Sequence, residues 1–411
     1  MAVGSARSED ALENWTDEPG DWFDLDRRIA RLQHDFRESH LVQWYADPDA
    51  IGLRAAIASI SLSRFYVNQQ LRLVAPVYDD RLFIRFLQHR HEEYAVDDTD
   101  ELAEMEYRHP SGLMVGVGAN AYHEKEDMDL GWIVGWHMDR NRFLRLRYIQ
   151  QRWLYDEKND DWGRYDRFPN LWTLDAQWEL PAGLKLVAEG AWEYPWRQEM
   201  NPPDPLIGET VRERTGWERS GRIRVERRRI GAVYGGWIGT SVRTLTEQFH
   251  DGPRYHRMQR EYRAKGFLLY GFRPWTLESD LALGQTHESK FRETLSGTGI
   301  RRQTAKEMIA QVSLRRTFRA AGIRPFVELF NSFILRDLEQ TGDLEPVRTD
   351  VQNNLRIGTG FGLYFRGGTA RVSGKVRSLP SGELRLRVAQ NMDKSWVGNF
   401  GGGGLLLLLT W

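Results

Sequence analysis

The chain has 411 residues, of which 41% are hydrophobic and 28% are charged, and its mean hydropathy is -0.59. No run approaches the roughly 20 apolar residues that a membrane-spanning helix needs, so helical spans are excluded. The formal net charge of -1 argues against nucleic acid binding, and the absence of cysteine excludes disulfides and thiolate metal sites.

Residues 1–50 differ from the rest of the chain and are predicted to form a separate N-terminal segment. An amphipathic helix is expected over residues 21–40, because four apolar residues recur at spacings of three and four: Leu25, Ile29, Leu32 and Phe36. This helix either packs against its own chain or docks a periplasmic partner.

Residues 51–411 show a period of two, with turn residues at intervals, which predicts antiparallel β-strands. The clearest hairpin spans residues 171–196. Its apolar set is Trp172, Leu174, Ala176, Trp178, Leu180, Leu184, Leu186, Ala188, Gly190, Trp192, Tyr194 and Trp196, and Pro181, Ala182 and Gly183 form the turn. Similar alternation occurs at 81–88, 142–155, 222–229, 306–318 and 383–388.

Short turns are expected at 79–80, 110–112, 140–141, 181–183, 366–368 and 380–382, and longer polar loops at 156–169, 198–213, 289–299 and 337–348. These turns and loops divide residues 51–411 into about 16 to 18 strands. With both ends of the chain in the periplasm, counting strands back from Trp411 places some short turns on the extracellular side and some long loops on the periplasmic side. One strand is therefore missed or added, either near residues 51–61 or between 349 and 392.

The sequence ends in GGGGLLLLLTW, with Leu405, Leu407, Leu409 and Trp411 at alternate positions. These four residues would form one apolar stripe of a strand that ends on an interfacial aromatic ring. A buried edge strand of a soluble sheet would show similar alternation.

The tail resembles the C-terminal signal of bacterial outer-membrane β-barrels, which the barrel-assembly machinery recognises. The resemblance implies an all-β fold, a transmembrane antiparallel barrel that contacts outer-membrane lipid. No secretion signal is visible at the N-terminus, so an outer-membrane location requires that it has been removed. The alternative fold is a soluble β-sandwich or propeller.

One face of the predicted strands is charged, and we expect it to line a water-filled lumen. The candidate lumen-lining residues are Arg145, Arg147, Asp175, Glu179, Glu189, Glu193, Arg222, Arg224, Glu226, Arg228, Arg315, Glu328, Arg385 and Arg387. For each of them, a salt bridge that stabilises the barrel is an alternative role to solute contact. On this face Leu406 and Leu408 interrupt the charged pattern, and the N-terminal helix is the nearest apolar partner for them.

No catalytic motif is present: the sequence lacks GxSxG, HExxH and Walker patterns. The alternate glycines in 357–365 and 231–239 are attributed to close packing or curvature. His89 and His91 share a strand face but have no third ligand, so no metal and no cofactor are expected.

The sequence therefore predicts a porin-like channel that passes small polar or anionic solutes and is not an enzyme. A specialised version resembles the outer-membrane exporters of acidic exopolysaccharide. The alternatives are a scaffold barrel of an envelope export or assembly complex and, less favoured, a barrel enzyme.

Overall fold

The computed structural model describes residues 51–410, apart from connections at 62–63, 79–80, 94–95, 122–127, 140–141, 152–163, 200–210, 250–253, 295–296, 319–322, 343–347, 366–367, 373–374, 380 and 393–399. The predicted N-terminal segment with its helix, and Trp411, lie outside the described residues. No helix in the described part of the chain is long and apolar enough to span a membrane.

Strands account for almost all described residues. The first eleven are β1 (Gly52–Ser61), β2 (Arg64–Tyr78), β3 (Leu82–Glu93), β4 (Val96–Arg108), β5 (Leu113–Ala121), β6 (Met128–Asp139), β7 (Arg142–Gln150), β8 (Arg164–Arg167), β9 (Asn170–Leu180), β10 (Leu184–Glu193) and β11 (Trp196–Glu199). The others are β12 (Val211–Arg229), β13 (Ala232–Phe249), β14 (Arg254–Phe272), β15 (Trp275–Thr294), β16 (Gly297–Thr317), β17 (Ile323–Gly342), β18 (Arg348–Phe365), β19 (Gly368–Val372), β20 (Lys375–Leu379), β21 (Ser381–Asn391) and β22 (Phe400–Thr410). A 3-10 turn, η2 (Pro181–Gly183), joins β9 to β10, as the sequence predicts.

The main sheet contains 20 strands, and its antiparallel pairings return to their starting point. Apart from β8 and β11, each strand of this sheet pairs with the sheet strand that follows it in the chain, and β22 pairs both with β21 and with β1. Without β8 and β11, which extend β9 and β10 beyond Pro169 and Pro195, the ring has eighteen strands. This number lies within the predicted range, and the pairing of β1 with β22 closes the ladder of the described ring strands.

Alternation along each strand separates an apolar face from a polar one. In β17, Val327 and Leu329 are 49% and 62% exposed, whereas Phe326 and Glu328 are 2% and 1% exposed. Because the ring shields one side of the sheet, we call the face that contains Glu328 the inner face and the opposite one the outer face. Exposed apolar side chains on the outer face include Trp132, Trp136, Leu174, Ile223 and Ile357.

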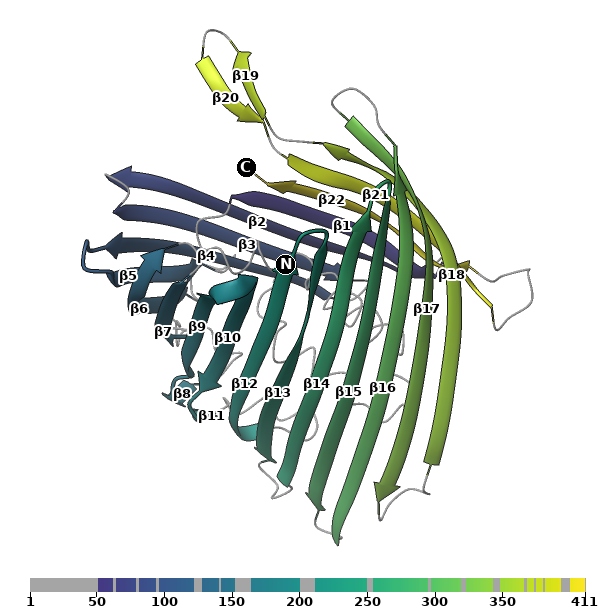
Figure 1. Ribbon diagram of the computed structural model, residues 1–411. Helices are drawn as coiled ribbons and strands as arrows, with labels where there is room; N and C mark the ends of the chain where they lie inside the picture. The colour runs from purple at the N-terminus through teal and green to yellow at the C-terminus, as the bar shows by residue number, and fades with distance from the viewer. Residues whose placement is uncertain are drawn as a thin grey trace.

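The connections differ between the two rims of the ring. Gly52 pairs with Thr410, so the first and last ring strands begin and end at the same rim. Turns of two to five residues, such as 140–141, 181–183, 230–231 and 273–274, lie at this rim, which we call the short-turn rim. The longest connections, 151–169 and 194–210, lie at the other rim, and Figure 1 shows β12–β18 extending toward it as a tall curved wall.

Two predicted loops, 289–299 and 337–348, are longer than the connections between the strands. Residues 289–299 belong mostly to β15 and β16, and residues 337–342 belong to β17, because strands of 18 to 21 residues continue where both faces are polar. There the period of two in hydrophobicity disappears, although the backbone pairing continues.

The turns predicted at 366–368 and 380–382 fall at the boundaries between β18 and β19 and between β20 and β21, where residues 366–367 and 380 lie outside the described residues. They flank a small hairpin, β19–β20, which forms its own sheet between β18 and β21 and projects from the ring (Figure 1). The hairpin accounts for the added strand between residues 349 and 392, because both of its strands lie in one connection at the short-turn rim.

Candidate functional site: the charged inner face

Three clusters of ion pairs lie on the inner face, each within a few residues of the short-turn rim. The first comprises Arg85, Glu104, Glu106, Arg108, Arg145, Arg147 and Asp175; the second Glu189, Arg222, Arg224, Glu226 and Arg228; the third Glu278, Arg315, Glu328, Glu383, Arg385 and Arg387. We call these three clusters together the ion-pair belt.

The first cluster is organised around two buried carboxylates of β4. Glu106 accepts two hydrogen bonds from Arg85, at 2.7 and 2.8 Å, and others from Arg108 at 2.9 Å and Arg145 at 2.8 Å. Glu104 accepts from Arg145 at 2.6 Å and from Arg147 at 2.8 Å. Charge-assisted bonds of this kind are among the stronger hydrogen bonds in proteins.

Glycines make these contacts possible, because β5 and β6 lie between β4 and β7 in the ring. A Cβ atom at Gly118 would lie 3.4 Å from Cγ of Glu104, and one at Gly116 would lie 3.4 Å from Cβ of Glu106. Glycines on the inner face of the two intervening strands, Gly116 and Gly118 of β5 and Gly131 and Gly135 of β6, therefore let guanidinium groups of β7 reach carboxylates of β4.

The third cluster uses the same arrangement. Arg387 on β21 donates to Glu328 on β17 across β18, with Nε 2.9 Å from Oε2. A Cβ atom at Gly360 of β18 would lie 2.9 Å from that oxygen and 3.2 Å from Cγ of Arg387. The alternate glycines of 357–365 thus serve close packing, which the sequence predicts. Arg315 lies 3.5 Å from Glu328 and stacks over Phe326 at 4.7 Å.

The second cluster joins β10 and β12. Arg222 donates to Glu189 at 2.7 Å, and Glu226 accepts from Arg224 at 2.6 Å and Arg228 at 2.7 Å. Arg224 also lies over the ring of Phe267 on β14, at 5.0 Å.

Twelve of the fourteen sequence-predicted lumen residues lie in the belt. Glu179 and Glu193 lie outside it, at opposite ends of the β9–β10 hairpin. Sequence reasoning missed Arg85, Glu104, Glu106, Arg108, Glu278 and Glu383. The alternation of Glu104 and Glu106 with Ala103, Met105 and Tyr107 could have identified two of them.

The predicted C-terminal stripe is described only in part. Leu405 is 41% exposed on the outer face, whereas Leu406 is 8% exposed and faces inward. Leu407 and Leu409 share the side of Leu405, as alternation requires.

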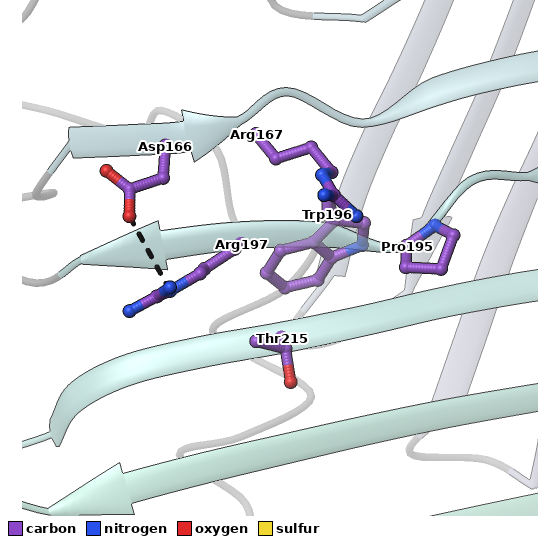
Figure 2. A pocket seen from close by; sticks show the side chains of 6 residues that line it. All are labelled: Asp166, Arg167, Pro195, Trp196, Arg197 and Thr215. Atoms are coloured by element: carbon purple, nitrogen blue, oxygen red, sulfur yellow. Dashed lines mark ion pairs between the residues drawn. The ribbon is translucent and has the colours of Figure 1, made fainter.

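A cleft of about 270 Å³ lies at the long-loop rim between β8, β11 and β12 (Figure 2). Its lining includes Trp196, Thr215 and the ion pair of Arg197 with Asp166, at 3.5 Å. Arg197 also lies 3.0 Å from Glu213. Since carboxylates of the same chain already surround this guanidinium, we assign no ligand to the cleft. Among the described residues, no group of three or more His, Asp or Glu could hold a metal ion.

No family model matches the chain, and no curated protein matches its sequence. Solved structures that match include Pseudomonas aeruginosa OccK5 (OpdH), with 11% identity, coverage of 88% of this chain and 96% of that one, and a TM-score of 0.39. OmpT, an outer membrane protein of Vibrio cholerae, matches with 10% identity, coverage of 88% and 98%, and a TM-score of 0.34. A bacterial polysaccharide outer membrane secretin matches with 11% identity, coverage of 88% and 97%, and a TM-score of 0.31.

Proposed function

We propose that the chain spans the bacterial outer membrane as a β-barrel and conducts small polar solutes, with a preference for anions. One observation carries this proposal: a closed eighteen-strand ring has exposed apolar side chains on its outer face and ion pairs on its inner face. An outer membrane barrel needs an apolar band toward lipid and a polar interior, whereas a soluble barrel needs the reverse.

The strand lengths support the membrane assignment. A transmembrane strand needs about 9 to 11 residues, and the shortest ring strands, β5 and β7, have nine. By the usual arrangement of short periplasmic turns, the short-turn rim faces the periplasm, and the tall wall of β12–β18 extends beyond the outer leaflet.

Solute preference follows from the belt. Barrels of 16 to 18 strands are wide enough for an aqueous channel, so long inner-face side chains narrow the path. The first and second clusters each contain one more arginine than carboxylates, and the third is balanced. A wall with excess fixed positive charge lowers the barrier for anions. The fourteen sequence-predicted residues are thus proposed to line the lumen, most of them within ion pairs.

The C-terminal strand supports a further part of the proposal. Leu405, Leu407 and Leu409 share the outer face of β22, which closes the ring against β1. We propose that this stripe is the segment that the barrel-assembly machinery recognises.

The decisive experiment measures conductance and reversal potential in planar bilayers under a salt gradient. We expect discrete conductance steps and a reversal potential on the anion-selective side. Arg222→Glu places a negative charge where a guanidinium is one-third exposed on the inner face, so it should shift selectivity toward cations. Arg302→Glu makes the same charge change on the outer face of β16 and should leave the potential unchanged.

If heat-modifiable, correctly folded protein gives no conductance, the proposal that the chain forms a channel is overturned. Equal shifts in the two variants would overturn the assignment of inner-face charge as the source of selectivity.

A further inference from the structure

A cluster of aromatic rings and arginines lies on the outer face of β10, β12 and β14, on one side of the ring (Figure 1). The guanidinium group of Arg219 lies over the rings of Trp217 and Trp192, at 4.6 and 5.4 Å. Trp192 stacks on Tyr194 with ring centroids 5.7 Å apart, and these two side chains are 49% and 44% exposed. Arg260 of β14 lies in the same ladder row as Arg219, with one residue of β13 between them. We call these five residues the outer patch.

The outer patch lies at the far boundary of an apolar stretch of the outer face. On β12, Ile223 and Val225 are 52% and 43% exposed and lie between Arg219 and Arg229, which is at the short-turn rim. Arg219 is ten residues from Arg229, roughly 33 Å along the strand. A strand tilted by about 40° rises roughly 25 Å over that length, which is the height of the lipid-facing band of outer-membrane barrels. With the short-turn rim in the periplasm, the outer patch is therefore level with the headgroups of the outer leaflet.

The sheet around Arg219 and Arg260 supplies no carboxylate to their face. Both arginines are exposed, and within the described part of the chain neither forms an ion pair. Their outer-face ladder neighbours, directly opposite or diagonal, are Gly190, Trp192, Thr240, Val242, Thr244, Gln285, His287 and Ser289. On the inner face of the same strand, by contrast, Arg222 donates to Glu189 at 2.7 Å. The outer patch thus offers two positive charges to an anion from outside the chain.

A phosphorylated sugar headgroup fits this combination of groups. A guanidinium group can bind a phosphate through two parallel hydrogen bonds. The exposed rings of Trp192 and Tyr194 present negative faces, which attract the C–H bonds of a sugar ring. Arg219 and Arg260 are two strands apart, roughly 10 Å between their backbones, so they suit a headgroup with two separated phosphates better than a single phosphodiester. A glycolipid of the lipid A type has such a headgroup, a disaccharide with a phosphate at each end.

We propose that the outer patch binds the bisphosphorylated disaccharide headgroup of an outer-leaflet glycolipid of the lipid A type. Arg219 and Arg260 each bind one phosphate, and the ring of Trp192 contacts the sugar. The acyl chains lie along the apolar stretch that contains Ile223 and Val225. The inference rests on the proposed function for the orientation of the barrel in the membrane, and it adds a binding site on the face opposite to the lumen.

Binding of purified lipid A to delipidated, full-length protein in a neutral detergent tests the site, with bound lipid counted by native mass spectrometry. Arg219→Gln combined with Arg260→Gln should weaken the binding of bisphosphorylated lipid A at least about tenfold, because both phosphates lose a charged donor. Heat-modifiable migration in gels checks that each variant is folded. Arg260→Gln alone replaces the double variant if the latter does not fold, and it should weaken binding at least about threefold.

A second pair of outer-face arginines provides the matched control, Arg229→Gln combined with Arg316→Gln. Both arginines are exposed near the short-turn rim, and Arg316 also lies over two aromatic rings, at 5.3 and 5.4 Å. They lie four strands apart, on β12 and β16, so one headgroup cannot contact both. This variant should keep the affinity of the unmodified protein for lipid A, and an equal loss in the two double variants overturns the proposal.

Further probes separate the glycolipid from other sources of phosphate. Dephosphorylated lipid A and phosphatidylglycerol should each bind at least about tenfold more weakly than bisphosphorylated lipid A, because each lacks the pair of phosphates. Inorganic phosphate in large excess should not displace lipid A. Trp192→Leu should weaken lipid A binding about threefold or more, because the ring that contacts the sugar is removed. Equal binding of either lipid probe, displacement by inorganic phosphate, or unchanged affinity in Trp192→Leu overturns the assignment of this headgroup.

Conductance separates this inference from the proposed function. Since Arg219 and Arg260 lie on the outer face, their double variant should keep the conductance and the reversal potential of the unmodified protein. Lipid A binding without any conductance would overturn the channel and retain the outer patch. Anion-selective conductance, together with lipid A affinity that the double variant does not change, would overturn the outer patch and retain the channel.

Discussion

The buried carboxylate of Glu328 allows the sharpest test of how the inner face is stabilised. Glu328 is 1% exposed and accepts two hydrogen bonds from Arg387, while Arg315 lies 3.5 Å away. Glu328→Gln keeps the shape of the side chain but removes the charge that both guanidinium groups face. Removing one partner of a buried ion pair costs about 3 to 5 kcal/mol, and the amide oxygen recovers part of this as a neutral acceptor. We expect a loss of about 3 kcal/mol in the free energy of unfolding.

The assay is reversible denaturant unfolding from lipid vesicles, followed by the fluorescence of the 16 tryptophans. Glu218→Gln is the control: its partner Arg243 is 3.9 Å away, and both side chains are about half exposed. An exposed pair contributes little, so this variant should change stability by at most about 0.5 kcal/mol. The combined change Glu328→Met and Arg387→Met should restore most of the loss, because no uncompensated charge remains between those two residues. Equal, small effects of Glu328→Gln and Glu218→Gln would refute the reasoning.

Two further predictions concern the glycine strands and the outer face. Gly116→Ala should lower unfolding stability by about 1 to 3 kcal/mol, because its Cβ would lie 2.5 Å from the carbonyl oxygen of Met105. Gly266→Ala, with nothing within 4 Å, should be neutral or stabilising in the same unfolding assay, and a matching loss in both variants would contradict the steric argument. Leu329→Arg should cost about 2 to 4 kcal/mol if this outer-face position lies near the bilayer midplane. Glu339→Arg, ten residues farther along β17, should change the same free energy by at most about 0.5 kcal/mol. Equal losses in the two variants would contradict the placement of Leu329 in the lipid-facing apolar band.

The sequence predicts the faces of the strands well because side chains alternate strictly along a strand. Leu186 and Trp192 of β10 are exposed and Val187 is buried, as the period of two requires. The strand ends were harder to predict. Where β15 and β16 continue past the apolar band, residues on both faces are polar, and the hydrophobic signal stops before the hydrogen-bonded ladder does.

The belt could be predicted only as a set of residues that share a face. Arg145 and Glu104 are separated by 41 residues, and their contact depends on the ring order and on small residues in the two strands between them. A single sequence reveals the charged face but not which strand lies opposite which. The near-neutral total charge also conceals a net charge of -7 in residues 1–50 and of +6 in residues 51–411, because the two nearly cancel.

The pairing of β1 with β22 has a consequence for the order of folding. Gly52 and Thr410, near opposite ends of the sequence, are ladder partners, so no partly synthesised chain can complete the sheet. Until the last strand arrives, β1 presents an unpaired hydrogen-bonding edge that could pair with another molecule. The slowest step of folding, and the one with the most exposed backbone edge, should therefore be the pairing of β22 with β1. A chain that lacks its last eleven residues should aggregate rather than merely lose stability.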